Sequence, residues 1–271
     1  MRYTVLIFTA IILLGGGLLA CNEKRDIRGE QSEYSLDRTK FRGYLVYDHK
    51  QRGRRPGVLI FHEWWGQNKE VRRRADMLAE HGYTALVADM YGEGKQADTF
   101  NEAAELASAV SKNPELRQQR FMAALEHLKK HESVDPEKIA AIGYSFGGNI
   151  VLQSALDGAD IDGVVSFYGG FLITTPPDDS DVKARILVLH GEKDWYVTPQ
   201  MLAKFKVEMK KAGITYELKV YSEANHGYTN PEAEALKAKF KGMHLDYNEA
   251  ADKQSWEDLQ KFLQSVFYDR E

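Results

Sequence analysis

The sequence predicts an α/β fold in which a mainly parallel, doubly wound sheet carries helices on both faces. From Gly57 onward, short apolar runs rich in β-branched residues alternate with longer amphipathic segments. This rhythm is typical of parallel strands covered by crossover helices. The chain has 271 residues, of which 43% are hydrophobic and 28% are charged. A chain of this length and composition can bury the core of one large α/β domain.

The expected elements follow one another along the chain in a regular order. A first strand is predicted at 41–47, where apolar and polar residues alternate, and a turn-rich basic stretch follows at 51–55. The later strand candidates are 58–61, 83–88, 139–143, 164–168, 186–189 and 216–221. Helical patterns lie at 69–80, 98–111, 115–130, 147–156, 199–211 and 248–267. No repeat or long insertion interrupts this order, so we expect a single domain at 39–271 without a large lid.

Charge and cysteine content exclude several classes of function. The 36 basic and 40 acidic residues give a net charge of −4, which provides no overall field to hold nucleic acid. Nucleic acid is therefore not expected among the partners. Cys21 is the only cysteine, so the sequence contains neither an intramolecular disulfide nor a multi-cysteine metal site.

The N-terminus has the pattern of an export signal. A basic start at Arg2 precedes an apolar run over 3–20, which ends in small residues before Cys21. The segment Leu18-Leu19-Ala20-Cys21 resembles a bacterial lipobox. This resemblance implies cleavage before Cys21, lipidation of that cysteine and a lipid anchor in the cell envelope. The alternative is a plain transmembrane anchor, because 18 apolar residues nearly suffice to span a membrane.

The predicted domain organisation follows from this start. Residues 1–20 are expected to be a lipoprotein signal peptide. Residues 21–38 are polar and charged without apolar periodicity, and we predict that they form a tether between the anchor and the domain.

The strongest chemical motif is a strand that runs directly into the pattern G-x-S-x-G. Ser145 lies between Gly143 and Gly147, after an apolar strand and before an amphipathic helix. A nucleophile elbow needs this context because the turn is tight and exposes the serine hydroxyl. The amide of Phe146 would then stabilise an oxyanion at the start of the helix. The alternative is a glycine-rich turn that only caps the helix.

Two further residues complete a candidate triad. Asp194 follows the strand at 186–189, and His226 follows the strand at 216–221. The order serine, acid, histidine is that of the α/β-hydrolase fold, and all three residues fall at the carboxyl ends of strands. We expect His226 to take the proton of Ser145 and Asp194 to orient His226. Glu192 is a competing acid in the same loop, while Asp194 could instead cap a helix and His226 could be a surface histidine.

The loop after the strand at 58–61 is the third part of the site. It reads His62-Glu63-Trp64-Trp65-Gly66, and the amide of Trp64 is placed to donate the second oxyanion hydrogen bond. Because Trp64 and Trp65 are adjacent, at least one is expected to line the cleft rather than the core. His62 and Glu63 lack a following His-Glu-x-x-His spacing, so no metal site is predicted.

Together these motifs resemble the dienelactone hydrolase family, or carboxymethylenebutenolidases, within the α/β-hydrolases. The resemblance spans about residues 40 to 265, and the segment 62–66 is its most specific part. The other matching segments are 88–92, 143–148, 190–194, 226–228 and 247–251 with Trp256 and Phe262. The resemblance implies one α/β-hydrolase domain without a large lid. It also implies hydrolysis of an enol-lactone through a covalent acyl-enzyme, with no cofactor.

The resemblance assigns roles to individual positions. Ser145 takes the place of the nucleophile, His226 that of the base and Asp194 that of the acid. Glu63 takes the place of a glutamate that contacts the resting nucleophile, and Tyr91 that of a tyrosine at the rim of the site.

An aromatic pocket for a small or planar acyl group is a further expectation from the placement of these motifs. Its predicted members are Trp64, Trp65, Tyr91, Phe171 and Tyr228.

Two positions depart from the family pattern. Characterised dienelactone hydrolases use cysteine where this sequence has Ser145, and a serine needs a general base to act as a nucleophile. Asn230 stands where the family has an arginine that binds the substrate carboxylate. An asparagine supplies neither the charge nor the bidentate fork of an arginine.

The sequence therefore predicts a lipid-anchored envelope serine hydrolase that cleaves a carboxylic ester or lactone. The expected partners are this small substrate and the membrane, and the oligomeric state is not indicated. A general carboxylesterase or peptidase on the same fold stays open. A non-catalytic envelope binding protein with this fold is the alternative from a different class.

Overall fold

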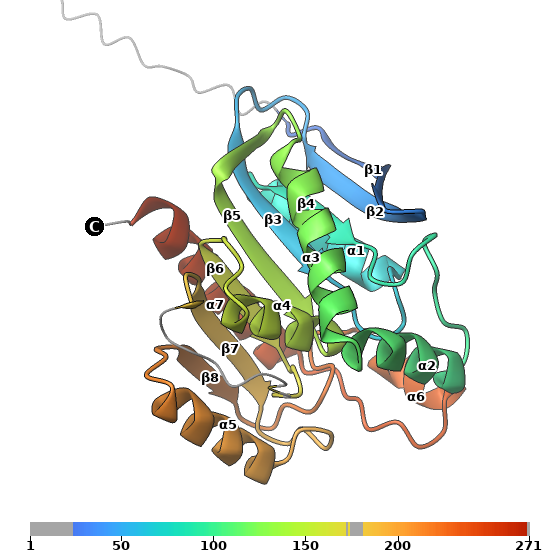
Figure 1. Ribbon diagram of the computed structural model, residues 1–271. Helices are drawn as coiled ribbons and strands as arrows, with labels where there is room; N and C mark the ends of the chain where they lie inside the picture. The colour runs from blue at the N-terminus through green and yellow to red at the C-terminus, as the bar shows by residue number, and fades with distance from the viewer. Residues whose placement is uncertain (1–23, 172, 174–180, 270–271) are drawn as a thin grey trace, which may run out of the picture.

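One twisted sheet organises the chain in this computed structural model, which describes residues 24–171, 173 and 181–269 (Figure 1). The sheet has the strand order β1-β2-β4-β3-β5-β6-β7-β8. Neighbouring strands from β4 to β8 in this order pair in parallel, whereas β1 and β2 are antiparallel. The strands are β1 (Ile27–Leu36), β2 (Thr39–Asp48), β3 (Arg55–Phe61), β4 (Thr84–Ala88), β5 (Val134–Tyr144), β6 (Gly163–Phe167), β7 (Arg185–Gly191) and β8 (Glu217–Tyr221).

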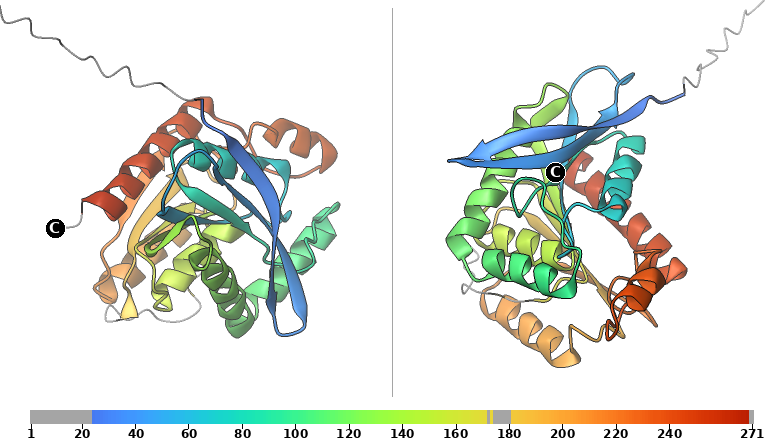
Figure 2. Two further views of the ribbon diagram at one scale, coloured as in Figure 1. Left: turned by 90° about the horizontal axis from the view of Figure 1, so that it is seen from above. Right: turned by 90° about the vertical axis from the view of Figure 1, so that its right-hand side faces the viewer.

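Helices cover both faces of the sheet (Figure 1, Figure 2). Those in the described part of the chain are α1 (Lys69–Glu80), α2 (Phe100–Ser111), α3 (Pro114–Lys129), α4 (Phe146–Leu156), α5 (Pro199–Lys211), α6 (Ala233–Lys239) and α7 (Glu249–Tyr268). One core cluster joins the sheet to α3, α4 and α5, and a second joins it to α1 and α7. The predicted doubly wound α/β fold of a single domain is confirmed.

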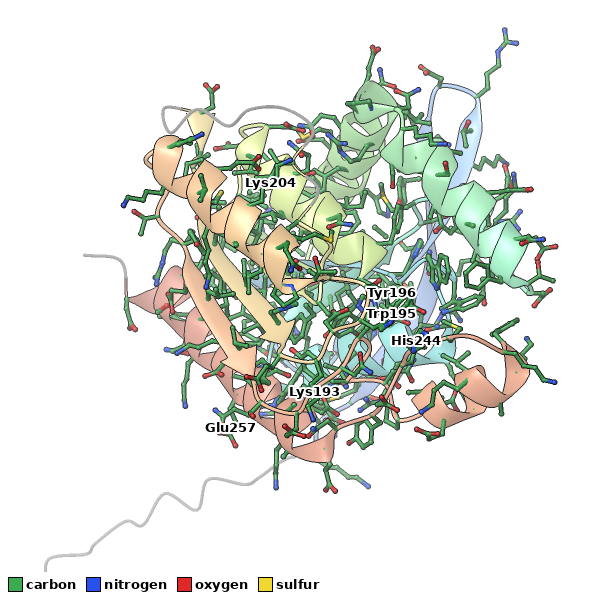
Figure 3. All side chains as sticks on the ribbon, turned by 90° about the horizontal axis from the view of Figure 1, so that it is seen from below. Lys193, Trp195, Tyr196, Lys204, His244 and Glu257 are labelled. Atoms are coloured by element: carbon green, nitrogen blue, oxygen red, sulfur yellow. The ribbon has the colours of Figure 1, made fainter. Side chains whose placement is uncertain are left out.

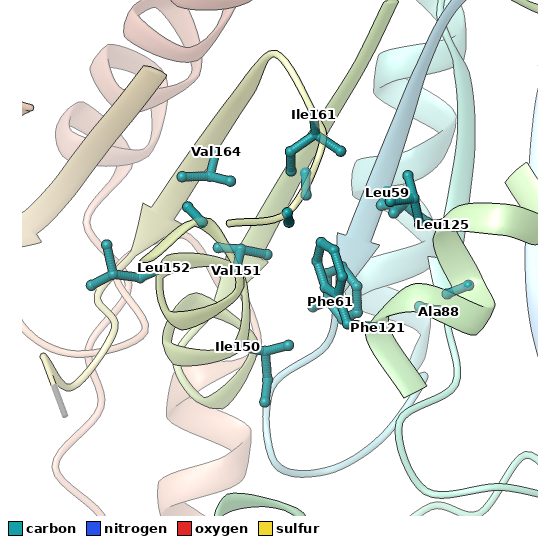
Figure 4. Close-up of a cluster of buried hydrophobic side chains, with 14 of the residues drawn as sticks. Leu59, Phe61, Ala88, Phe121, Leu125, Ile150, Val151, Leu152, Ile161 and Val164 are labelled. Carbon is teal, nitrogen blue, oxygen red and sulfur yellow. The ribbon is translucent and has the colours of Figure 1, made fainter. Parts of the chain in front are cut away.

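The two cores take alternate residues of the same strands. In β3, Leu59 and Phe61 enter the core under α3 and α4, whereas Val58 and Ile60 enter the core under α1 and α7. Successive side chains of a strand point to opposite faces, so a strand buried on both faces is apolar throughout. Phe61 stacks on Phe121 of α3 with ring centroids 5.1 Å apart (Figure 4). This packing holds the carboxyl end of β3 firmly beside α3.

The predicted tether at 21–38 is wrong over most of its described length, because residues 27–36 form β1. This strand pairs along its whole length with β2. The buried Tyr34 ring stacks on Phe41 at 5.2 Å, and the Tyr34 hydroxyl hydrogen-bonds the backbone of Asp89. Apolar periodicity missed the strand because β1 is an edge strand with mostly exposed side chains, held by ladder hydrogen bonds that any residue can make.

Most other boundaries agree with the sequence because local caps set them. Asn68 caps α1 and Thr198 caps α5 through their side-chain oxygens, and Pro199 begins α5. The helix α6 was not predicted, since it is short and largely exposed.

Two predictions about the N-terminus lie outside the described residues. The signal peptide at 1–20 and Cys21 fall in the segment that the structure does not describe. In the part of the chain that it does describe, no helix has the length and apolar character needed to cross a membrane.

Candidate active site

Ser145 occupies a strained turn between β5 and α4. Its backbone has φ 53° and ψ −111°, a region that non-glycine residues rarely adopt and that is often found at functional sites. The N–H of Ser145 donates to the carbonyl oxygen of Phe167 at 2.9 Å. A Cβ at Gly147 would collide with the backbone of Phe61, and one at Gly143 would collide with Gly147. The two glycines are therefore required by close backbone approach around the serine.

The three predicted triad residues form one hydrogen-bonded chain. Ser145 Oγ lies 2.8 Å from His226 Nε2, and His226 Nδ1 lies 2.8 Å from Asp194 Oδ2. The Asp194 side chain is fully buried, and its Oδ1 accepts hydrogen bonds from the backbone N–H groups of Tyr196 and Val197 at 2.9 and 3.0 Å. These bonds fix the carboxylate so that Oδ2 faces the imidazole.

The alternative acid is excluded by position. Glu192 Oε2 accepts a hydrogen bond from Ser222 Oγ at 3.1 Å on an exposed part of the loop, whereas Asp194 makes the contact with His226. Ser145, Asp194 and His226 follow β5, β7 and β8, so all three lie at the carboxyl edge of the sheet, where active sites of open α/β sheets gather.

The peptide unit between Glu63 and Trp64 is held in a fixed orientation. Its carbonyl oxygen contacts His62 Nδ1 at 2.6 Å and accepts from the N–H of Gly66 at 3.2 Å. The N–H of Met90 donates to His62 Nε2 at 3.3 Å, so Nδ1 carries the proton and donates to Glu63. Burial lowers the pKa of His62, which favours this neutral form. Because a peptide unit is planar and trans, the Trp64 N–H points away from the fixed oxygen.

The second amide of interest belongs to Phe146. As the first residue of α4, it has an N–H without a partner inside the helix. The helix dipole adds positive potential at this end of α4. Both predicted oxyanion donors thus belong to peptide units that the fold holds in place.

Glu63 pairs with Tyr168, a residue that the sequence analysis missed. The Tyr168 hydroxyl donates to Glu63 Oε1 at 3.2 Å and shares a hydrogen bond of 2.8 Å with Thr229 Oγ1. Burial raises the pKa of Glu63, while the positive form of His226 and the Tyr168 hydroxyl act against that rise. The carboxyl contact expected with the resting Ser145 is replaced by this one, because the serine hydroxyl turns toward His226.

A cavity of about 310 Å³ opens onto Ser145 and His226. Most of its lining is apolar or aromatic, which is typical of small-molecule sites. The lining residues are Glu63, Trp64, Trp65, Phe100, Ser145, Asn149, Gly170, Tyr196, Val197, His226, Met243 and Leu245. Both tryptophans of the pair contribute, so the prediction that at least one lines the cleft is confirmed.

Aromatic residues surround the imidazole and the nearby surface. The rings of Tyr168 and Tyr196 each approach His226 edge-on, with centroids 5.0 Å away. Next along the loop, Trp195 is 60% exposed and stacks on His244 at 4.1 Å. Trp195, Tyr196 and His244 lie close together in the view from below (Figure 3).

Three predicted pocket residues lie elsewhere. Tyr228 is fully buried in the core beside Tyr168. Phe171 is buried and stacks on Phe205 at 4.6 Å. Tyr91 is also buried, and its hydroxyl donates to the carbonyl oxygen of Trp64 at 2.9 Å. Tyr91 therefore supports the loop that carries the cavity wall, while the prediction that these three residues line the pocket is wrong.

Sequence reasoning missed several lining residues because their elements carry no motif. Met243 and Leu245 come from the loop after α6, and Phe100 begins α2. Asn149 could have been predicted from the sequence, since it lies one helical turn after Ser145 and therefore on the same side of the predicted helix. Asn230 is buried outside the lining, where its Oδ1 accepts from the N–H of Glu232 at 2.9 Å.

A metal centre and a second large hollow are the other candidate sites among the described residues. The described residues contain no group of three or more histidine, cysteine, aspartate or glutamate side chains that could hold a metal ion. A larger hollow of about 570 Å³ lies at the opposite, amino edge of the sheet, where Ile139, Asp162 and Arg185 are among its lining residues. Its lining includes the salt-bridged Lys183 and Asp160 and contains no histidine, so it lacks the serine–histidine contact found at the carboxyl edge.

Comparison with known proteins agrees with this geometry. The dienelactone hydrolase family profile matches residues 41–267. The chain is 31% identical over 211 residues to Protein usf of Aquifex pyrophilus, covering 76% of this chain and 89% of that protein.

Two solved structures are similar in fold and sequence. A protein solved as m3DLH has a TM-score of 0.83 and 31% identity, covering 89% of this chain and 99% of that one. A dienelactone hydrolase-like promiscuous phosphotriesterase from metagenomic libraries has a TM-score of 0.82 and 29% identity, with the same coverage. With the match over most of its length and the α/β-hydrolase architecture, this chain belongs to the dienelactone hydrolase family and is an enzyme of the ester- and lactone-hydrolysing class.

Proposed function

We propose that this protein is a serine hydrolase that cleaves a carboxylic ester or lactone through a covalent acyl-enzyme on Ser145. The observation that carries the proposal is the hydrogen-bonded chain from Ser145 through His226 to Asp194 beside an apolar cavity. A serine is activated by an adjacent base that a third group orients, and these contacts have that form.

The proposed reaction begins with attack of Ser145 Oγ on the substrate carbonyl carbon. His226 Nε2 accepts the serine proton, and the buried Asp194 carboxylate stabilises the imidazolium. The N–H groups of Phe146 and Trp64 donate to the oxyanion of the tetrahedral intermediate. Collapse of the intermediate breaks the ester bond, and the imidazolium protonates the leaving alkoxide.

Water completes the cycle in the second half-reaction. His226 removes a proton from the water that attacks the acyl carbonyl, and it then returns a proton to Ser145 Oγ as the acid is released. With a lactone substrate, ring opening leaves the alcohol as part of the acyl group, so this hydrolysis releases a single product that carries both the alcohol and the acid. No cofactor takes part in the proposed steps.

An active-site probe separates this proposal from a non-catalytic binding protein. The chain from residue 22 and its Ser145→Ala variant would be incubated with a fluorophosphonate, and intact mass would be recorded. We expect one adduct on the parent chain and none on the variant, with hydrolysis of short p-nitrophenyl esters lost in parallel. A folded parent chain with neither adduct nor turnover would overturn the proposal in favour of the binding protein.

We also propose that the protein is exported and anchored in the cell envelope by lipid on Cys21. The support is the basic start, the apolar run and the small residues before the only cysteine. In a bacterial host, the full-length chain should incorporate labelled fatty acid and sediment with membranes. The Cys21→Ala variant should incorporate none, and equal labelling of the two chains would refute the anchor.

A further inference from the structure

Asn149 introduces a polar side chain into the apolar wall of the cavity. It lies on α4 one turn beyond Ser145, to whose carbonyl oxygen its backbone N–H donates at 3.2 Å. Its lining neighbours include Trp64, Phe100 and Val197. A residue at this place therefore faces the same space as the reacting groups.

The Asn149 side-chain amide is without a hydrogen-bond partner in the described part of the chain. Its Oδ1 is buried and unpaired, and no hydrogen bond of Nδ2 is formed there either. A Cβ at Gly170 would lie 3.2 Å from Nδ2 and 3.4 Å from Oδ1, so the glycine leaves room for the amide against this wall. Buried polar groups in native proteins are almost always paired. Because the Asn149 amide is unpaired and lies close to Ser145, a bound substrate can form a hydrogen bond with it.

The charge of the lining restricts which molecule can bind. Among the described lining residues, the acid–base side chains are Glu63, Tyr196 and His226, and neither lysine nor arginine is present. A substrate carboxylate would lose its hydration without gaining a cation, which is costly. An uncharged group with a hydrogen-bonding oxygen would instead pair with the amide at little cost.

We propose that Asn149 determines specificity by hydrogen-bonding a neutral oxygen, such as an ether, hydroxyl or ketone, of an otherwise apolar, uncharged ester or lactone. This inference rests on the proposed function, because it takes the cavity at Ser145 as the substrate site. It assigns Asn149 a binding role rather than a part in proton transfer.

The test uses pairs of substrates that differ by one CH₂ replaced by oxygen. On the acyl side the pair is p-nitrophenyl butyrate and p-nitrophenyl methoxyacetate. On the alcohol side it is cyclohexyl acetate and tetrahydropyran-4-yl acetate. Values of kcat/KM are measured for the parent chain, for the near-isosteric Asn149→Leu variant and for Gln119→Leu. Gln119 is exposed on α3, so its variant makes a matched amide-to-apolar change away from the cavity.

The oxygen-to-CH₂ ratio of kcat/KM in each pair is compared between the parent chain and each variant. Because the two esters are the same in every measurement, their different intrinsic reactivity cancels in this comparison. We expect Asn149→Leu to lower the oxygen-to-CH₂ ratio about fivefold in at least one pair, the fold-change that a neutral hydrogen bond of about 1 kcal/mol provides. The change should lie mainly in KM, because the bond exists before and during reaction. Gln119→Leu should keep the parent ratios. Unchanged ratios for Asn149→Leu in both pairs would overturn the assignment, and Asn149→Ala serves if the leucine variant does not fold.

A third comparison tests the requirement for an uncharged substrate. Mono-p-nitrophenyl glutarate carries a carboxylate where p-nitrophenyl pentanoate ends in a methyl group. We expect the hemiester to have a kcat/KM at least about 100-fold lower. Comparable turnover of the two would refute the exclusion of anions. Fluorophosphonate labelling of the parent chain is run in parallel, so absence of an adduct identifies a failure of the proposed function rather than of this inference.

Discussion

The imidazole of His62 donates a hydrogen bond of 2.6 Å to the carbonyl oxygen of Glu63, and this oxygen shares its peptide unit with the N–H of Trp64. His62 thus acts on the proposed oxyanion through another group. It is buried at the end of β3, beside the backbone of Met90, so its position is set by the core rather than by substrate.

Replacing His62 should impair catalysis more than binding. His62→Phe keeps a buried ring but removes the donor, and we expect kcat to fall about tenfold with KM nearly constant, because oxyanion contacts form in the transition state. Steady-state kinetics on a short p-nitrophenyl ester measures this split. His62→Gln, which retains a side-chain donor, should recover part of the loss. Full kcat in His62→Phe would show that the peptide needs no such support.

Asp194→Asn should almost abolish turnover for a geometric reason. The backbone N–H groups of Tyr196 and Val197 must meet an acceptor, so the asparagine oxygen faces them and its NH₂ faces His226 Nδ1. Nδ1 would then be the acceptor and Nε2 would carry the proton, leaving no base for Ser145. We expect kcat to fall about 10⁴-fold, as inversion of the tautomer does in a serine–histidine–aspartate triad.

The same assay includes Glu192→Gln as a matched carboxylate-to-amide control. Glu192 is exposed and contacts Ser222 rather than His226, so its variant should retain turnover within about twofold of the parent. A large loss in this variant, together with an active Asp194→Asn, would reassign the acid.

Glu63→Gln should change how stability depends on pH. Burial raises the pKa of Glu63 in the folded state above its ordinary value of 4.5. The folded state then binds more protons than the unfolded state, so this group's contribution to stability is greatest below the ordinary pKa and declines as pH rises through the folded pKa. The glutamine variant lacks this decline. Melting temperatures at pH 4 and pH 7 should therefore show a gain for Glu63→Gln that grows with pH, and a constant offset would contradict it.

Tyr34→Phe tests whether β1 belongs to the folded domain. The Tyr34 hydroxyl accepts from the N–H of Asp89 at 3.0 Å and donates to its carbonyl oxygen at 3.3 Å. Loss of the hydroxyl leaves a buried backbone N–H unpaired, and we expect about 1–2 kcal/mol of destabilisation in urea unfolding. A cost near zero would mean that the strand is dispensable.

The site was more predictable from sequence than the edge of the sheet. Ser145 stands in the G-x-S-x-G pattern, and Ser145, Asp194 and His226 all follow short apolar strands. Because parallel strands bring their carboxyl ends to one edge, the motif and the strand positions together predicted that these three residues lie close together. β1 was not predicted, because backbone hydrogen bonds to β2 hold this edge strand and do not require an apolar pattern of side chains. Tyr168 and the lining residues Met243 and Leu245 could not be predicted from the sequence, because packing sets the direction of a side chain in a loop. Tyr228 shows the same limit, since its position beside His226 in sequence does not place it in the cavity.

The spacing of the triad along the chain also affects the order of folding. Ser145 and His226 are 81 residues apart, and their contact forms beyond β8, the outermost parallel strand. A nascent chain can fold β5 and α4 and present Ser145 while still lacking His226, its proposed base. The proposed reactivity of Ser145 toward an acylating probe would therefore arise late in synthesis, only after β8 and the following loop that carries His226 have joined the sheet.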